Sequence, residues 1–288
     1  MSSSLVSVLD FTNEDLEDIF KKISLFKTGE VTRDYQGCSV GLLFEKFSTR
    51  TRLSFEVAIS KLGAYPVYIN KSDTQLSRGE SIEETAKMFS LYLDALVYRT
   101  SSQKNIENFA EFSNIPVINA LSDSEHPTQI ISDIFTIKEM KPKKDISDLK
   151  ITYIGDGNNI ANSLSLIAET LDLNLTVCTP KGYEPNSRTY CTSDPMEAAQ
   201  DADVIYTDVW TSMGDEGKEK KRMKDFTNFQ INSTLTDLSK EDYLFMHCLP
   251  AHIGEEVTKE VIESSNSAVY AQAENKQYTA MAIIDYFL

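Results

Sequence analysis

Cationic and hydroxyl side chains near residue 50 could together bind a phosphate group. Residues 48–52, Ser-Thr-Arg-Thr-Arg, supply three hydroxyls and two guanidinium groups directly after an apolar run at 38–44 that predicts a buried strand. Apolar residues at helical spacing follow from Leu53 to Leu62, so Ser48 and Thr49 occupy N-cap positions of a predicted helix. Backbone amides and the dipole of a helix N-terminus favour oxyanions, and arginines strengthen that preference. The alternative is an ordinary capped helix with solvated arginines.

All three histidines lie in two short segments, and each segment follows or ends a predicted strand. His126 precedes Pro127, a favoured first residue of a helix, with Gln129 nearby in the first turn. An imidazole there can donate a hydrogen bond to a carbonyl or phosphate oxygen, although a capping histidine is the simpler alternative. The second segment, residues 247–252, contains Cys248. Without a demonstrated base or cationic neighbour, Cys248 is predicted to be a contact residue and not a nucleophile.

Two further polar segments follow predicted strands in the second half of the chain. Residues 155–159, Gly-Asp-Gly-Asn-Asn, resemble a dinucleotide fingerprint, but Ile160 replaces the third glycine and the next strand ends at 177–180 without an acidic residue. These residues are therefore predicted to present amides to a small polar ligand. Asp208 can hold an ammonium group, and the loop at 212–214, followed by a mixed-charge run at 215–224, can close as a lid.

Strand and helix patterns alternate along the chain, which predicts an α/β fold with parallel sheets. The predicted strands lie at 38–44, 66–69, 95–98, 116–118, 150–154, 174–178, 204–207 and 243–247. The predicted helices lie at 13–27, 51–62, 81–92, 106–112, 128–139, 160–171, 195–201 and 255–264. The charged, proline-containing stretch at 141–145 suits a domain boundary. We therefore expect two domains, each a parallel β-sheet flanked by helices, with the active site in the interdomain cleft at the carboxyl ends of strands.

Length, charge and cysteine use limit the class of protein. A chain of 288 residues is long enough for two domains. The net charge of −16 argues against a nucleic-acid or anionic-membrane partner. No apolar run is long enough to span a bilayer, and the N-terminus lacks the pattern of a signal peptide. The four cysteines show no metal-ligand spacing, so we expect reduced thiols in a cytoplasmic protein.

Taken together, these segments resemble the aspartate and ornithine carbamoyltransferase family over essentially the whole chain. The motifs at 48–52 and at 126–129, His-Pro-Thr-Gln, are highly specific for that family in this order. The segments at 155–159, 208–214 and 247–250 are similar to those of the members that use ornithine. A member that uses aspartate would be expected to lack the Ser-Met-Gly loop and to carry a lysine-bearing loop at 76–80.

The resemblance implies two substrate domains and an oligomer. Residues 1–134, with a C-terminal helix within 271–288, would bind carbamoyl phosphate, and residues 135–270 would bind ornithine. The family pattern implies a homotrimer, or an assembly of trimers, with active sites between subunits and with no metal or organic cofactor.

The resemblance also assigns site residues. Those for carbamoyl phosphate are Ser48, Thr49, Arg50, Thr51, Gln75, Arg99, His126, Gln129, Cys248, Leu249 and Lys276. Those for ornithine are Asn159, Asp208, Ser212 and Met213. Catalytic roles fall to Arg50, Arg99, His126 and Cys248, and Gln75 is expected to reach in from a neighbouring subunit. Lys276 stands where ornithine-using members usually carry arginine, so the bidentate fork is lost and weaker carbamoyl phosphate binding is predicted.

The implied reaction is attack by the δ-amine of L-ornithine on the carbonyl carbon of carbamoyl phosphate, which gives L-citrulline and phosphate. Three alternatives stay open at this point. The same chemistry could act on a related amine such as putrescine or N-acetylornithine. The chain could be a dinucleotide-dependent oxidoreductase, which the broken fingerprint disfavours. It could also be an inactive binding protein, for which only the Lys276 departure argues.

Overall fold

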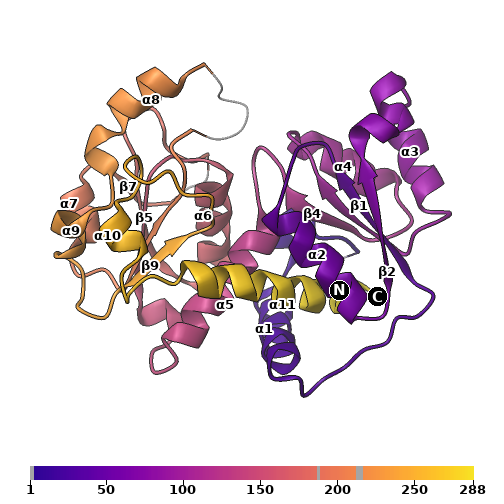
Figure 1. The fold of residues 1–288 in the computed structure, drawn as a ribbon, viewed down its shortest axis with the longest axis horizontal. Coiled ribbons are helices and arrows are strands. Elements are labelled where there is room, and N and C mark those ends of the chain that lie inside the picture. Colours follow the sequence, from indigo (N-terminus) through magenta and orange to yellow (C-terminus); the bar gives the residue numbers. More distant parts are fainter. Residues whose placement is uncertain (1–2, 187–188, 212–216) are drawn as a thin grey trace. The chain divides into compact units, whose positions relative to one another are not determined.

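The computed structural model describes residues 3–186, 189–211 and 217–288. The chain forms two compact units, one of residues 1–132 and 274–288 and the other of residues 133–273 (Figure 1). Both boundaries fall inside helices, α5 (Pro127–Met140) and α11 (Val269–Phe287). Each unit contains a parallel β-sheet flanked by helices, which confirms the predicted α/β fold of two domains. Among the described residues, no helix is both long and apolar enough to cross a bilayer.

In the described part of unit 1, the first compact unit, the sheet has four strands in the order β2-β1-β3-β4. Their bounds are β1 (Ser39–Phe44), β2 (Tyr65–Asn70), β3 (Ala95–Arg99) and β4 (Val117–Leu121). The helices that precede or connect them are α1 (Asn13–Thr28), α2 (Arg50–Lys61), α3 (Ile82–Phe89) and α4 (Gln103–Phe112), with short 3-10 turns η1 (Val8–Asp10), η2 (Lys71–Asp73) and η3 (Gln75–Arg78). Every residue of β3 is buried, as expected for a strand covered on both faces of its sheet.

In the described part of unit 2, the second compact unit, the sheet has five strands in the order β7-β6-β5-β8-β9. Their bounds are β5 (Lys150–Ile154), β6 (Asn174–Cys178), β7 (Cys191–Thr192), β8 (Val204–Thr207) and β9 (Leu244–His247). The helices are α6 (Asn159–Leu171), α7 (Pro195–Ala199), α8 (Glu219–Asp225), α9 (Ser233–Thr236) and α10 (Lys259–Ile262), with 3-10 turns η4 (Ile146–Asp148) and η5 (Thr227–Phe229). Strand ends pair in register, Ile154 with Cys178 and Thr207 with His247, so the polar segments that follow them share one edge of the sheet.

Four predicted helices have the wrong bounds. The helix predicted at 106–112 begins at Gln103. The helix predicted at 81–92 ends at Phe89. The helix predicted at 255–264 begins only at Lys259, because residues 252–257 form a turn in which the Gly254 amide donates to the Val257 carbonyl at 2.9 Å. The last helix, which the family resemblance places at about 279–288, begins ten residues earlier at Val269, and its added turns carry buried polar residues such as Gln272 and Lys276.

The buried carboxylate of Asp203 links three segments of unit 2. It accepts hydrogen bonds from the Lys144 and Lys240 ammonium groups at 2.7 and 2.6 Å, and from the Lys150 amide at 3.0 Å. Burial alone would raise the pKa of Asp203, but these hydrogen bonds outweigh burial and hold its pKa below the usual 3.8.

We expect Asp203→Asn to lower the free energy of unfolding by about 1.5–3 kcal/mol, because it removes a buried carboxylate that accepts charged hydrogen bonds from two partly exposed lysines. A carboxylate with a lowered folded-state pKa stabilises the fold above its unfolded pKa of about 3.9 and loses that contribution as the pH falls through the folded value. The difference in the free energy of unfolding between the variant and the parent protein should therefore become smaller below about pH 4. Urea titrations across pH 3–7 measure this free-energy difference, with the exposed Glu260→Gln as a control. A difference of the same size at every pH would contradict a stabilising role for the ionised Asp203.

Candidate active site

The predicted phosphate residues of unit 1 lie at the carboxyl ends of two adjacent strands. Phe44 at the end of β1 pairs in register with Arg99 at the end of β3. The amide of Glu45 donates to the Arg99 carbonyl at 3.0 Å, which fixes the start of the loop that leads into α2 at Arg50. Sheet topology therefore places the Ser48–Thr51 segment beside the end of the strand that carries Arg99.

The expectation that Thr49 caps α2 through its side chain is wrong. Thr49 stands at the N-cap, but its backbone is helical, with φ −87° and ψ −60°, and among the described residues its side chain makes no capping hydrogen bond. By contrast, Thr12 at the N-cap of α1 does accept a hydrogen bond from the Asp15 amide. Without a side-chain cap, the first-turn amides of α2 can serve an anion.

The C-terminal helix brings Lys276 into this group of residues. Its ammonium donates to the Gln129 side-chain oxygen at 2.5 Å and to the Thr51 hydroxyl at 3.4 Å. Lys276, Gln129 and Thr51 are all buried. The residue that departs from the family pattern is therefore in direct contact with two other predicted site residues.

His126 is buried directly before α5, which begins at Pro127 as predicted. Burial, together with the positive charges of Lys276 and Arg99, lowers the pKa of His126 well below 6.5. The imidazole is therefore neutral near pH 7. In that state it can act as a hydrogen-bond donor to a substrate oxygen without adding positive charge.

Two unit 1 residues extend this description. Gln75 is exposed in η3, and a role in a neighbouring subunit stays a prediction. Glu45, which the sequence analysis missed, accepts from the Tyr98 hydroxyl at 2.5 Å and from the Lys71 ammonium at 2.8 Å. Glu45 therefore joins the loop before α2 to the strand carrying Arg99 and to the turn preceding Gln75. A charged residue between an apolar strand and the hydroxyl cluster was the signal available in the sequence.

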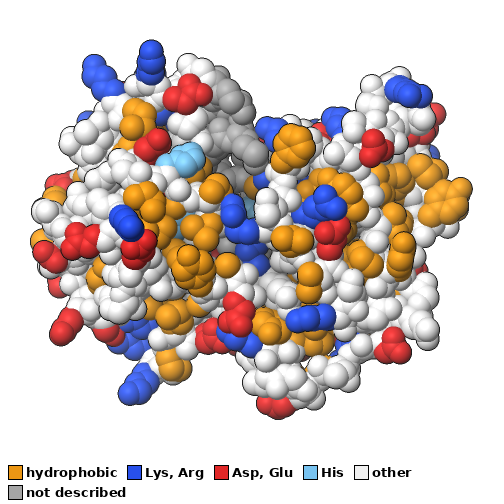
Figure 2. Space-filling view, in the orientation of Figure 1, with side chains coloured by type: hydrophobic (Ala, Val, Ile, Leu, Met, Phe, Trp, Pro, Cys, Tyr) orange, Lys and Arg blue, Asp and Glu red, His pale blue; other side chains and the backbone are white. Residues whose placement is uncertain are grey.

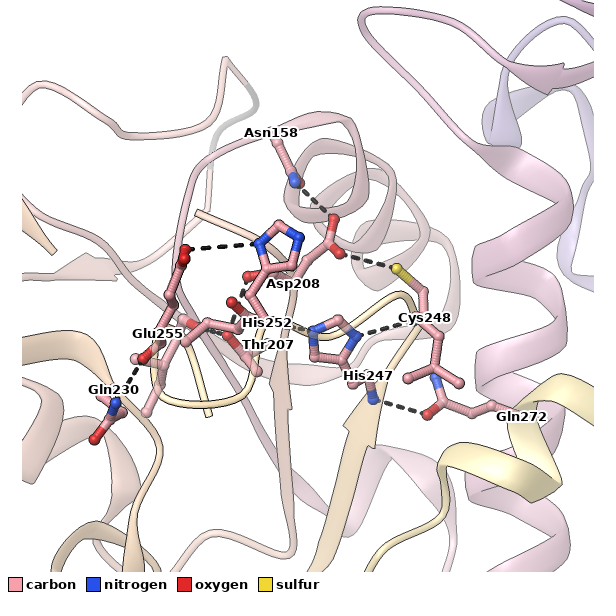
Figure 3. Close-up of polar contacts among 12 residues, drawn as sticks. Asn158, Thr207, Asp208, Gln230, His247, Cys248, His252, Glu255 and Gln272 are labelled. Atoms are coloured by element: carbon pink, nitrogen blue, oxygen red, sulfur yellow. Dashed lines mark hydrogen bonds and ion pairs between the residues drawn. The ribbon is translucent and has the colours of Figure 1, made fainter. Parts of the chain in front are cut away.

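In unit 2, Asp208 lies at the centre of the predicted amine site (Figure 3). One carboxylate oxygen accepts from the Asn158 amide at 2.8 Å, and the other accepts from the Cys248 thiol at 3.0 Å. Asp208 follows β8, Cys248 follows β9, and these strand ends pair in register. The carboxylate is buried and fixed in orientation, which suits the recognition of an ammonium group.

Of the other predicted ornithine residues, the structure describes Asn159. Asn159 is the first residue of α6, next to Asn158, and is half-buried. Ser212 and Met213 lie outside the described residues.

Residue 157 must be glycine because the backbone of a neighbouring loop packs against it. A Cβ atom at this residue would lie 2.2 Å from the Tyr183 carbonyl oxygen and 2.4 Å from the Pro185 nitrogen. The loop at 183–185 therefore occupies the space that a dinucleotide pyrophosphate would need beside the glycine. This packing explains the partial fingerprint without a nucleotide and argues against the oxidoreductase alternative.

The loop at Cys248 and Leu249 rests on His247, a residue whose role the sequence analysis did not identify. The His247 ring is fully buried, and its Nδ1 atom accepts from the Leu249 amide at 2.9 Å (Figure 3). The His247 amide donates to the Gln272 side chain at 2.9 Å. Leu249 has a left-handed φ of 57°, which is rare for a branched side chain, so these contacts hold a strained backbone beside Cys248.

Comparison with known proteins identifies the family. Residues 3–139 match the carbamoyl-P binding domain of aspartate/ornithine carbamoyltransferase, and residues 147–287 match the Asp/Orn binding domain. The chain belongs to the aspartate/ornithine carbamoyltransferase family.

Individual relatives are named as ornithine carbamoyltransferases. The chain is 48% identical to "Ornithine carbamoyltransferase, catabolic" of Thermoplasma volcanium, over 97% of this chain and 96% of that protein. It is 43% identical to "Ornithine carbamoyltransferase, anabolic" of Pyrococcus furiosus, over 97% of this chain and 94% of that protein. The solved structure of the ornithine carbamoyltransferase from Pyrococcus furiosus superposes with a TM-score of 0.93 at 42% identity, covering 98% of this chain and 96% of that one.

Proposed function

We infer that this chain transfers the carbamoyl group of carbamoyl phosphate to the δ-amine of L-ornithine, giving L-citrulline and phosphate. The observation that carries the inference is the division of site chemistry between the units. Unit 1 gathers Arg99, neutral His126 and Lys276 near an uncapped helix start, whereas unit 2 holds the buried carboxylate of Asp208. The first set suits an anionic acyl donor and the second suits an amino-acid ammonium group.

The residues of unit 1 would bind carbamoyl phosphate and stabilise its transition state. Ser48, Thr49 and Thr51, with the first-turn amides of α2, would hold the phosphate oxygens. Arg50 and Arg99 would stabilise charge on the tetrahedral oxyanion and the departing phosphate, and His126 would donate to the carbamoyl oxygen. Such preorganised electrostatic stabilisation commonly makes the largest contribution to acyl transfer.

The residues of unit 2 would orient the amine. An alkylamine with a pKa of about 10.4 is neutral in only about one molecule in a thousand near pH 7.4, so the rate should rise with pH until another group limits it. Asp208 would anchor the α-ammonium group, with Asn159, Ser212 and Met213 as further contacts and Cys248 with Leu249 beside the reacting groups. Correct orientation of two bound reactants can lower the activation barrier by about 7–11 kcal/mol.

A panel of amines tests the proposed function directly. Purified protein is incubated with carbamoyl phosphate and, separately, with L-ornithine, putrescine, N-acetylornithine and L-aspartate, and the carbamoylated product and phosphate are measured. Selective citrulline formation is the expected result. Selective carbamoylation of another amine would preserve the unit 1 assignment and overturn the substrate of unit 2, and carbamoyl phosphate binding without product would favour the inactive binding protein.

We also propose that the chain acts as a homotrimer and is cytoplasmic. A set of exposed hydrophobic residues on α2, β2 and the loop before α2, here called the patch, supports the trimer, and hydrophobic side chains gather on this face of unit 1 in Figure 2. The patch consists of Phe47, Leu53, Val57, Tyr65 and Tyr68. Phe47, at 92% exposure, adjoins the predicted phosphate residues, as expected if a second copy covers the patch near the site.

All four cysteines are described and none forms a disulfide, which suits a reducing compartment.

We expect the double variant Leu53→Glu/Val57→Glu to sediment as a monomer and to lose most citrulline formation. Two carboxylates on the patch would have to be buried on association, and Gln75 could no longer reach a neighbouring site. Analytical ultracentrifugation and circular dichroism test this result, with Leu91→Glu as a control at a more exposed leucine outside the patch. An active, fully folded monomer would contradict the proposal.

We expect Lys276→Arg to lower the KM for carbamoyl phosphate by about three- to tenfold with little change in kcat. Arginine restores a bidentate donor, an improvement of about 1 kcal/mol over a single ammonium contact. Lys276→Met should raise the same KM, because it removes the charge that now contacts Gln129 and Thr51. Steady-state kinetics at saturating ornithine measure both variants, and identical KM values for the three proteins would remove Lys276 from the site.

A further inference from the structure

Three side chains in the turn between β9 and α10 converge outside the residues assigned to either substrate. One ligand atom from each of His252, Glu255 and Glu256 lies within 4.8 Å of the other two. His252 Nδ1 is 3.6 Å from a Glu255 carboxylate oxygen, and Figure 3 shows the ring facing this carboxylate. His252 and Glu255 are partly exposed, whereas Glu256 is fully buried. The group is therefore open to solvent on one side and closed on the other.

The backbone of this turn is held in place by several hydrogen bonds. The Glu255 amide donates to the His252 carbonyl at 2.9 Å, and the Gly254 amide donates to the Val257 carbonyl at 2.9 Å. The Gln230 side chain donates to the carbonyls of Gly254 and Glu255 at 2.9 and 2.8 Å. The three converging side chains thus extend from a fixed segment, so a ligand would not have to order the loop.

The buried carboxylate of Glu256 has one oxygen that is satisfied and one that is not. Oε1 faces His247 Nε2 at 3.0 Å and accepts from the His252 amide at 2.6 Å. Oε2 is buried and has no hydrogen-bond partner among the described residues. An unpartnered oxygen on a fully buried carboxylate is costly, because the group has lost its water without gaining a substitute.

His247 does not neutralise this carboxylate. Because the Leu249 amide donates to Nδ1 of His247, that nitrogen is unprotonated, and the single ring proton must sit on Nε2, facing Glu256. The ring is therefore neutral. No lysine or arginine among the described residues forms an ion pair with Glu256, so its carboxyl group has no cationic side chain beside it.

We propose that His252, Glu255 and Glu256 bind a divalent transition-metal ion, with zinc as the best match. Imidazole nitrogen and carboxylate oxygen are both ligand types that zinc accepts, and water could supply a fourth ligand on the exposed side. The two carboxylates balance the charge of the ion, and the ion gives the unpartnered oxygen of Glu256 its missing partner.

A second group of potential ligands, Asp208, His247 and Cys248, is a weaker candidate. Both ring nitrogens of His247 are engaged, one with the Leu249 amide and the other with Glu256, and both oxygens of Asp208 accept hydrogen bonds. A metal there would have to break these contacts. In the set at His252, by contrast, Glu256 keeps one oxygen without a hydrogen-bond partner among the described residues.

Metal titration of the whole, chelator-stripped protein tests the proposal. Zinc is titrated by calorimetry and cobalt(II) by its visible absorption, and one ion per chain is expected. His252→Ala and Glu255→Gln should each weaken binding at least tenfold, because each removes a direct ligand. Glu263→Gln, at a more exposed glutamate on the same surface segment, serves as the matched control and should bind like the parent protein. Both ligand variants alter exposed side chains, and circular dichroism verifies that they fold.

Two results would overturn the proposal. The first is the absence of stoichiometric binding at micromolar zinc or cobalt. The second is binding that survives both His252→Ala and Glu255→Gln but shows a sulfur-to-cobalt charge-transfer band and disappears in Cys248→Ser. That outcome would place the ion at the Asp208, His247 and Cys248 group.

Discussion

Replacing Arg99 with methionine is expected to lower kcat for citrulline formation by about 10²–10³-fold. Arg99 is a buried guanidinium at the carboxyl end of β3, in register with the strand that leads into the phosphate loop. Methionine fills a similar volume but cannot stabilise negative charge on the carbamoyl oxygen or the leaving phosphate. Removing one preorganised donor to a developing oxyanion typically costs about 3–4 kcal/mol of barrier.

A second measurement separates this role from simple damage to the fold. The charge of Arg99 is one of the causes that lower the pKa of His126, after burial and the charge of Lys276. The pKa of His126 should therefore rise in Arg99→Met while staying below its usual value, as followed by NMR of the ring protons. Lys104→Met, at an exposed lysine in the same unit, controls for loss of a positive charge. A kcat within twofold of the parent protein would exclude Arg99 from catalysis.

The sequence was sufficient to predict the parts of the site that depend on local pattern. Apolar runs located the strands of both sheets except β7, which has only two residues, and parallel sheets bring the ends of neighbouring strands to one edge. For this reason the strand pattern placed residues 48–51, Asp208 and Cys248 at such ends, whereas Arg99 was assigned to the site by the family resemblance. The resemblance to a family added the substrates, which strand patterns cannot supply.

The parts that could not be predicted depend on tertiary contacts. Gln272 and Lys276 are polar, yet each is buried in α11 because a partner distant in sequence satisfies it, His247 for one and Gln129 for the other. Likewise, nothing in the sequence around Glu256 indicates that one of its oxygens is satisfied and the other is not. Thr49 shows the limit of a local rule. Capping propensity predicts that its side chain accepts from an amide of the first helical turn, but an anion site needs those amides to remain available for the ligand.

Asp208→Asn is expected to lower kcat/KM for ornithine by about 30- to 4,000-fold, corresponding to the 2–5 kcal/mol typical of removing one partner from a buried, hydrogen-bonded charge pair. Asparagine keeps the shape of the side chain but removes the charge that would face the α-ammonium group. The loss should lie mainly in KM if Asp208 is an anchor, because the contact is then present in the ground state and the transition state alike.

Two substrates distinguish an anchor from a general base at this position. N-acetylornithine lacks the α-ammonium group, so the preference of the parent protein for ornithine over N-acetylornithine should collapse in Asp208→Asn if the carboxylate reads that charge. Exposed Asp237→Asn controls for the loss of one negative charge in the same unit. If the variant instead kept its KM and its preference for ornithine while kcat fell and the pH–rate profile lost a limb, Asp208 would be moving a proton. Because both oxygens of Asp208 are already held by Asn158 and Cys248, the geometry favours the fixed anchor.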